Sequence, residues 1–383
     1  MGVGDTHTVV IRSDGSAHAF GANDEGQCDI PETFGDITYI QASSGQGFTA
    51  LLRSDGEVIV CGDGLKTTGM DDVIPPLPSG LFYARIAAGC SHLVFLRSDG
   101  KLFAIGDNFH GQLDVPQPPD NEFFTEITSG SNHTVALTSD GNAIAWGQNE
   151  DGQCAIPALP GGGIWYVNAA TGMFHTLLLK SDGNAVAIGE PDDEAKGAVD
   201  VPQLPQGVHF TQVACGAEHS LFLRSDGQMM AAGLNDWGQC NVPEDLGALV
   251  SVAGGGWHTV ALQDDGRLVG FGADDVNQLD FDEEKDGYVV DRVPSKLLQA
   301  SFVSKTLVRF RKMNGDYLCD VSGETFEDIW TEIQKMGRSD AVFQKDGQLL
   351  SELASSQTPV RSWPLRLRIE PLKVQNRVVR KSA

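Results

Sequence analysis

The chain has 383 residues, of which 41% are hydrophobic, and a formal net charge of −25. This hydrophobic content is sufficient for a packed core and argues against intrinsic disorder. No apolar run approaches the ~20 residues of a membrane helix, and the first ten residues lack the basic and apolar segments of a signal peptide. We therefore expect a cytoplasmic or nuclear protein without a membrane-binding segment.

The charge is unevenly distributed. Residues 288–383 hold 16 Lys and Arg against 11 Asp and Glu, whereas residues 1–287 hold 11 basic and 41 acidic residues. The change of sign predicts a domain boundary near residue 288. A surface as acidic as that of the first part repels phosphate backbones, so we expect no binding to nucleic acid.

Asp-Gly pairs between apolar runs recur along the first part of the chain. Their Asp residues are Asp14, Asp55, Asp99, Asp140, Asp182, Asp226 and Asp265. Such a pair favours a β-hairpin, because Asp and Gly tolerate the positive φ angles of a tight turn. The separations lie between 39 and 44 residues. A period of this length, filled with strand-sized apolar segments, is typical of the blades of a β-propeller.

Each repeat has the same order of segments. A short β-rich stretch is followed by Gly-x-x-His, an apolar strand, the Ser-Asp-Gly turn, a second strand ending in Gly, and often Asn-x-x-Gly-Gln. The first repeat begins at Gly4 without a preceding strand of the usual length. We expect the missing strand to come from Ser295–Phe302, whose "LQAS" resembles "IQAS" at 40–43, so that a strap joins the first and last blades.

These repeats resemble regulator-of-chromosome-condensation (RCC) repeats, as in "GSNHTVALTSDGNAIAWGQNEDGQ" at 130–153. The resemblance extends from Gly4 to about Phe302 and implies an all-β, seven-bladed β-propeller over residues 1–302. The family's activities are diverse, so the fold does not define the function. We expect neither light sensing nor the wedge of an exchange factor, since "GWHT" occurs once and no repeat carries a long insertion.

The segment 303–383 is expected to form a second domain. Strands are predicted at "TLVRFRK" and "DYLCDV", then a helix from Thr325 with Phe326, Ile329, Trp330 and Ile333 on one face, and then two further strands. This order resembles the small α+β (β-grasp) fold of ubiquitin-like domains. Because the chain ends in the basic tail "RVVRKSA" without Gly-Gly, the resemblance implies a docking module and not a conjugated modifier.

Histidines recur in six repeats, at His7, His92, His133, His175, His219 and His258, and the second repeat has Phe48 at the same position. One His on each separate blade cannot form a shared metal site, so we interpret these residues as structural and expect each to hydrogen-bond within its own blade. The chain contains no phosphate-binding loop, HExxH, GxSxG or calcium-loop motif. The sequence thus predicts no enzyme, no catalytic residue, no metal and no cofactor. The seven cysteines form no CxxC pair and are expected to be reduced.

Antiparallel pairing places the Ser-Asp-Gly turns on one face of the ring and the Gly-x-x-His and Asn-x-x-Gly segments on the other. The turn segments are nearly uniform, whereas the opposite face varies between blades and carries aromatic and acidic residues, which is typical of protein interfaces. We expect a protein partner to bind Phe48, Phe109, His110, Phe174, Trp237, Trp257 and Asp236.

The sequence therefore favours a monomeric, non-enzymatic scaffold or adaptor. It leaves open a HERC-like, ubiquitin-ligase-associated substrate adaptor, or a guanine-nucleotide exchange factor for a small GTPase.

Overall fold

The computed structural model describes residues 1–12, 14–65, 74–189 and 197–281 in full, together with the backbone of five later strands. The chain forms two compact units, Met1–Val293 and Pro294–Ala383. In the described part of the chain the regular elements are all strands, and none is a helix that could cross a membrane.

The first unit consists of seven antiparallel sheets of three strands each, in chain order. We call these sheets blades 1 to 7. Their strands are β1 (Gly2–Val3), β2 (His7–Ile11) and β3 (Ala17–Gly21); β4 (Tyr39–Ser44), β5 (Phe48–Arg53) and β6 (Val58–Gly62); β7 (Tyr83–Ala88), β8 (His92–Arg97) and β9 (Leu102–Gly106); β10 (Phe124–Ser129), β11 (His133–Thr138) and β12 (Ala143–Gly147); β13 (Tyr166–Thr171), β14 (His175–Lys180) and β15 (Ala185–Gly189); β16 (Phe210–Cys215), β17 (His219–Arg224) and β18 (Met229–Gly233); and β19 (Leu249–Gly254), β20 (His258–Gln263) and β21 (Leu268–Gly272). The predicted seven-bladed propeller is confirmed.

The turn between the second and third strands of each blade differs in detail from the prediction. In blade 3, the Gly100 amide donates to the Arg97 carbonyl and the Arg97 amide donates to the Lys101 carbonyl, both at 2.9 Å. Gly100 has φ +77°, whereas Asp99 does not have a positive φ. The loop therefore has three residues, a type I turn followed by a left-handed Gly, and not the two-residue turn that the Asp-Gly pair predicted.

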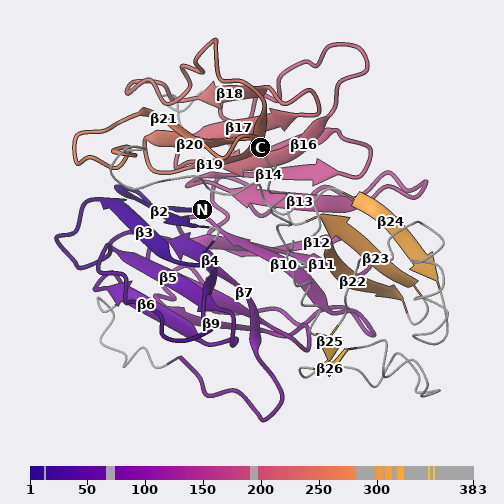
Figure 1. The fold of residues 1–383 in the computed structure, drawn as a ribbon. Helices are drawn as coiled ribbons and strands as arrows, with labels where there is room; N and C mark the ends of the chain where they lie inside the picture. Colours follow the sequence, from indigo (N-terminus) through magenta and orange to yellow (C-terminus); the bar gives the residue numbers. More distant parts are fainter. Residues whose placement is uncertain are drawn as a thin grey trace, which may run out of the picture. The chain divides into compact units, whose positions relative to one another are not determined.

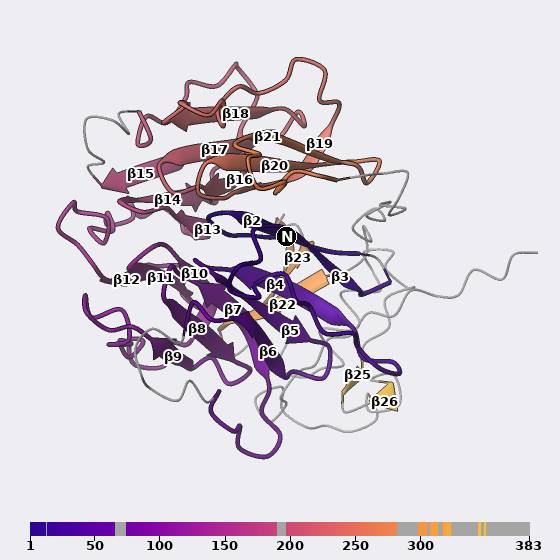
Figure 2. The same ribbon diagram turned by 90° about the vertical axis from the view of Figure 1, so that its left-hand side faces the viewer.

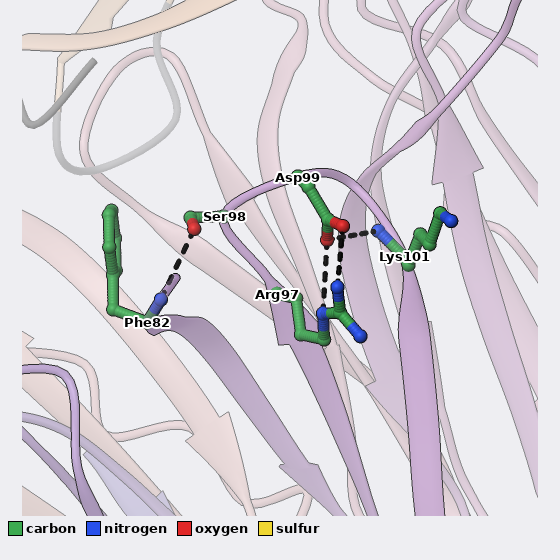
Figure 3. Close-up of polar contacts among 5 residues, drawn as sticks. All are labelled: Phe82, Arg97, Ser98, Asp99 and Lys101. Atoms are coloured by element: carbon green, nitrogen blue, oxygen red, sulfur yellow. Dashed lines mark hydrogen bonds and ion pairs between the residues drawn. The ribbon is translucent and has the colours of Figure 1, made fainter. Parts of the chain in front are cut away.

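The Asp of this turn acts through its side chain. Asp99 accepts a hydrogen bond from the Lys101 amide at 3.4 Å and forms an ion pair with Arg97 at 2.6 Å (Figure 3). The Ser98 hydroxyl accepts from the Phe82 amide at 3.2 Å, which ties the turn to the start of the first strand (Figure 3). The same Asp bond occurs in all seven turns, which explains why the sequence repeats Asp-Gly.

The core lies between neighbouring blades. The second strand of each blade is buried along almost its whole length, because its two faces contact the blades on either side. Between blades 2 and 3, Phe48 and Leu52 pack with Ile86 and Phe95 in one cluster. A strand buried on both faces reads as a continuous apolar run, which is why these segments show no alternation.

The first strand of blade 1 does not come from Ser295–Phe302, so the predicted strap is wrong. β1 is itself the first strand of blade 1 and pairs with β2 at Gly2↔Val9. Blade 7 contacts blade 1 directly, because the Gly256 amide donates to the Gly4 carbonyl at 3.2 Å. In both views β2 and β3 lie between the last sheet and the second (Figures 1 and 2). A first strand of two residues is enough here, because Val10 and Val260 share a core cluster across the junction.

The segment expected to form the strap belongs to the second unit. There β22 (Leu298–Ser304) pairs with β23 (Leu307–Lys312), which pairs in turn with β24 (Tyr317–Ser322). The short strands β25 (Gln344–Lys345) and β26 (Gln348–Leu349) form a separate hairpin. The two predicted strands around 314–315 are thus present as an antiparallel pair. The predicted helix after Thr325 and the last strand lie outside the described residues, and the ubiquitin-like fold stays a prediction.

Candidate protein-binding face

One face of the propeller is formed by two segments of each blade, the loop between its first and second strands and the loop after its third strand. We call this surface the loop face, and the opposite one, with the Ser-Asp-Gly turns, the turn face. The two loops of a blade are hydrogen-bonded to each other. The Gln148 amide donates to the Asn132 carbonyl at 2.9 Å, and the Ala273 amide donates to the Trp257 carbonyl at 2.8 Å. This arrangement agrees with the sequence prediction.

The Asn-x-x-Gly-Gln loops are held rigidly by their own side chains. In blade 6 the Asn235 Oδ1 atom accepts from the Cys240 amide at 2.8 Å, and the buried Gln239 side chain accepts from the Trp237 amide at 3.0 Å. Blade 1 repeats both bonds with Asn23 and Gln27. The sequence singled out this motif without a role for it. Its fixed residues shape the loop, and the two x positions are free to vary.

Most of the predicted partner-binding residues lie on the loop face. Phe109 is 86% exposed, Trp237 is 54% exposed and Trp257 is 38% exposed. Asp236 is also exposed, whereas His110 and Phe174 are half-buried. Phe109 and His110 contact each other edge to face, with ring centroids 5.2 Å apart.

Phe48 is the exception. It is fully buried and belongs to the core between blades 2 and 3. The sequence reasoning treated it as a variable surface residue, but it occupies the position of the repeated His, which is buried in the other blades. Its inclusion in the partner-binding set is therefore wrong.

The structure brings the positions of Trp237 and Trp257 together. The x-x loop of each blade lies against the start of the second strand of the next, as shown by the Thr259 hydroxyl, which donates to the Gln239 carbonyl at 2.8 Å. In blades 1 and 2 the equivalent positions are Glu25 and Gly47. A Cβ atom added to Gly47 would lie 3.3 Å from Glu25 Cγ. By this equivalence the two tryptophans are neighbours at the junction of blades 6 and 7.

Charges are separated between the two faces. Among the described residues the loop face carries no Lys or Arg. It carries carboxylates, namely Asp5, Asp24, Glu25, Asp63, Asp107, Glu150, Asp151, Glu218, Asp236, Asp274 and Asp275. The described basic residues of the propeller lie beside the turns, apart from Arg85, and several form ion pairs there, such as Arg224 with Asp226. The loop face is thus the acidic face.

The repeated histidines form a circuit between blades, not within them as predicted. Each Nε2 atom contacts a hydroxyl of the next blade: His7 with Thr49 at 2.8 Å, His133 with Thr176 at 2.9 Å, and so on to His258 with Thr8 at 3.0 Å. Since the Thr49 hydroxyl donates to the Gln27 carbonyl, it must accept from His7, which fixes Nε2–H as the tautomer.

Burial keeps these imidazoles neutral. It lowers the pKa of His7, His92, His175 and His258 to about 4, and that of His133 and His219 to about 3. Within the described ranges, no group of three or more His, Cys, Asp or Glu could hold a metal. The histidines therefore join the blades, and the structural interpretation of these residues agrees with their geometry.

The Gly of Gly-x-x-His makes a second circuit. Each of the seven packs on the carbonyl of its counterpart in the next blade, so that a Cβ atom on Gly130 would lie 2.2 Å from the Gly172 oxygen and one on Gly255 would lie 2.6 Å from the Gly4 oxygen. The same Gly packs on the imidazole three residues later, as a Cβ on Gly216 would lie 2.0 Å from His219 Cε1. Only glycine fits these positions.

The first strands line a central cavity of about 360 Å³. Several of its polar side chains are used to connect blades. Gln212 bonds both the carbonyl and the amide of Val252, at 3.0 and 3.1 Å, and Gln41 does the same with Ile86. These side chains serve the ring, so we assign no ligand to the cavity.

Sequence reasoning missed some exposed apolar residues outside the loop face. Phe34 is 79% exposed in the connector between blades 1 and 2, and Ile40 is 52% exposed in β4. Neither belongs to a repeated motif, so the pattern of the repeats gave no signal for them.

The fold defines this protein as a seven-bladed β-propeller. The family model of the regulator of chromosome condensation (RCC1) repeat matches residues 1–27, 83–112, 124–153 and 210–239. The chain is an RCC1-like propeller. No curated protein matches it.

Several solved structures share the fold. Prp20p from Saccharomyces cerevisiae, reported together with its binding to Gsp1p and histones, is 20% identical with a TM-score of 0.58, over 75% of this chain and 85% of that one. Human WBSCR16 is 17% identical with a TM-score of 0.57, over 68% and 86%. The CRINKLY WD40 ectodomain of the Arabidopsis thaliana receptor kinase ACR4 is 18% identical with a TM-score of 0.55, over 71% and 92%.

Proposed function

We propose that this protein is a non-enzymatic scaffold or adaptor that binds a protein partner through the loop face of its propeller. The observation that carries the proposal is the junction of blades 6 and 7, where two exposed tryptophans stand on neighbouring, rigidly held loops. Trp is among the residues whose truncation most often weakens a protein interface. Because the loops are fixed by their own hydrogen bonds, a partner that binds them loses little free energy in ordering them.

The test is a comparison of partner capture by the full chain and by Trp237→Ala/Trp257→Ala, with proteins of the source cell crosslinked and identified. We expect the double variant to lose the partner by about tenfold or more in affinity, since two such truncations cost at least ~2 kcal/mol. Phe34→Ala is the matched control, because it removes a still more exposed aromatic ring that lies outside the loop face.

A folded double variant that captures the partner undiminished, with Phe34→Ala also unaffected, would contradict the assignment of the loop face. Melting curves of all three proteins show whether they are folded. If binding is lost only in Phe34→Ala, the connector side of the propeller is the binding surface instead.

Residues 303–383 are proposed to serve as a docking module attached to this propeller. The resemblance of their strand order to ubiquitin-like domains supports this proposal, together with their net positive charge. Binding to Gsp1p and histones is a property of Prp20p. It makes a protein partner a reasonable expectation for this chain but does not select one.

A further inference from the structure

Beside the tryptophan pair, the loops of three consecutive blades carry carboxylates. The blade 6 loop adds Asp236, the blade 7 loop adds Asp274 and Asp275, and the blade 1 loop adds Asp24 and Glu25. These loops follow one another around the ring, because the blade 7 loop packs on blade 1. There a Cβ atom on Gly21 would lie 3.0 Å from Gln278 Cβ.

These carboxylates are available to a partner. Asp24, Asp236 and Asp275 are exposed. Their side chains have no hydrogen-bond or ion-pair partner among the residues that the structure describes. On the turn face, by contrast, the Asp side chains are used by Arg neighbours and by backbone amides, as in Asp99. At these positions the loop face therefore carries a negative charge that no other described residue of the propeller neutralises.

We propose that blades 6, 7 and 1 form a docking surface for a Lys- or Arg-rich segment of a partner protein. In this arrangement a cationic side chain of the partner stacks on Trp237 or Trp257, and neighbouring cationic side chains bind Asp236, Asp275 and Asp24. This inference rests on the proposed function and specifies the chemistry of the partner.

Two physical reasons support a basic segment. An indole ring is the best aromatic acceptor for a cation–π contact, and Arg makes this contact more often than Lys. Complementary charge around such an anchor accelerates association and excludes partners of the same sign. Anionic membranes and nucleic acids are repelled by this face, whereas a basic peptide matches both its tryptophans and its carboxylates.

The experiment uses the full chain and a fluorescently labelled peptide of alternating arginine and glycine. A second peptide carries citrulline, the neutral isostere of arginine, at every arginine position. We expect the arginine peptide to bind, with an affinity that falls as salt rises, and the citrulline peptide to bind about tenfold more weakly or not at all.

Two sets of variants locate the site. Trp237→Ala/Trp257→Ala should weaken binding of the arginine peptide about tenfold. Asp236→Asn/Asp275→Asn should weaken it severalfold and reduce its salt dependence, as expected for charges at the rim of an interface. The control is Glu32→Gln/Asp36→Asn, which changes the net charge equally but in the exposed connector between blades 1 and 2. This control should bind as the original chain does.

Equal weakening by both carboxylate pairs would overturn the proposal, because it would show general attraction to an acidic protein. Equal binding of the citrulline peptide would also overturn it. The chain's own basic segment 361–383 is the competing occupant. If the arginine peptide binds only after the Lys and Arg residues of that segment are replaced by Gln, the segment and not a partner occupies this face.

The failure of this inference can be distinguished from failure of the proposed function. Suppose that binding of a captured partner requires the tryptophans, but that the segment contacting them contains no Lys or Arg. The loop face would then remain the binding surface. This result would overturn the basic chemistry of the partner alone.

Discussion

Phe48 and Leu93 pack in one apolar cluster at the junction of blades 2 and 3. At each of the six other junctions, a His contacts a Thr or Ser hydroxyl at the same positions. Leu65, in the same cluster, takes the place of the buried Gln27 of blade 1, since a Cβ atom on Gly106 would lie 3.2 Å from Leu65 Cδ2 and one on Gly62 would lie 3.0 Å from Gln27 Cα. The polar His–hydroxyl pair has thus been replaced by an apolar pair. The exchange is concerted because either half alone would leave a buried polar group without a partner.

The first prediction concerns this concerted exchange. Phe48→His alone should lower the free energy of unfolding by roughly 2–4 kcal/mol, because the imidazole would face Leu93 in a buried site. Adding Leu93→Thr should recover about 1 kcal/mol through a new inter-blade hydrogen bond. Urea denaturation of the two single variants and the double variant measures this coupling. A strictly additive double variant would show that the His–Thr bond contributes nothing at this junction.

The second prediction concerns pH. The six histidines are neutral in the fold, with pKa values lowered to about 3 or 4 from 6.5. The unfolded chain therefore binds more protons between these values. The free energy of unfolding should therefore be highest above about pH 6.5, as far as these histidines determine it, and should fall as the pH drops toward 4.

Denaturation with urea at a series of pH values measures this slope. His92→Gln removes one titrating group, and the slope of its stability against pH should be shallower than that of the original chain. An unchanged slope would mean that the buried histidines do not cause the acid sensitivity. A free energy of unfolding that increases as the pH is lowered from 6.5 to 4 would contradict the neutral state of the buried histidines.

The third prediction concerns the turns. Asp99→Ala and Asp140→Ala should each lower stability by roughly 0.5–2 kcal/mol, because each removes an acceptor for the amide two residues later. Partner affinity per folded molecule should stay the same, since these turns lie on the turn face. Asp36→Ala, in an exposed connector, is the control and should change stability little. A strong loss of affinity at normal stability would reverse the assignment of the two faces.

The fourth prediction concerns the glycine circuit. Gly130→Ala should destabilise the propeller by roughly 1–3 kcal/mol or more, because its Cβ atom would overlap the Gly172 carbonyl oxygen. Gly80→Ala meets no atom within 4 Å, although Gly80 has φ +85°. It therefore measures the cost of the left-handed backbone alone. Melting temperatures of the two variants compare these effects, and equal losses would show that close packing between blades is not what selects Gly130.

The sequence by itself determined the number of blades, the order of their strands and the position of the loop face. These follow from local signals that occur seven times, since each Ser-Asp-Gly turn reverses the chain and each buried strand is a continuous apolar run. It also identified Phe109, Trp237 and Trp257 as surface aromatics, because they occupy positions that vary within a fixed loop motif. The assignment of the histidines to a structural role likewise needed only their regular spacing.

Only the tertiary structure decided what joins one repeat to the next. The partner of His7 is Thr49, and the partner of His258 is Thr8, far away in the chain. A repeating sequence shows the same residues whether a bond is made within a blade or across a junction. The prediction from the sequence therefore assigned these bonds to the wrong partners. The strap failed for the same reason, because closure depends on contacts such as Gly256 with Gly4 that have no local signal. Phe48 looked like a surface residue until the packing around Leu93 showed it to be core.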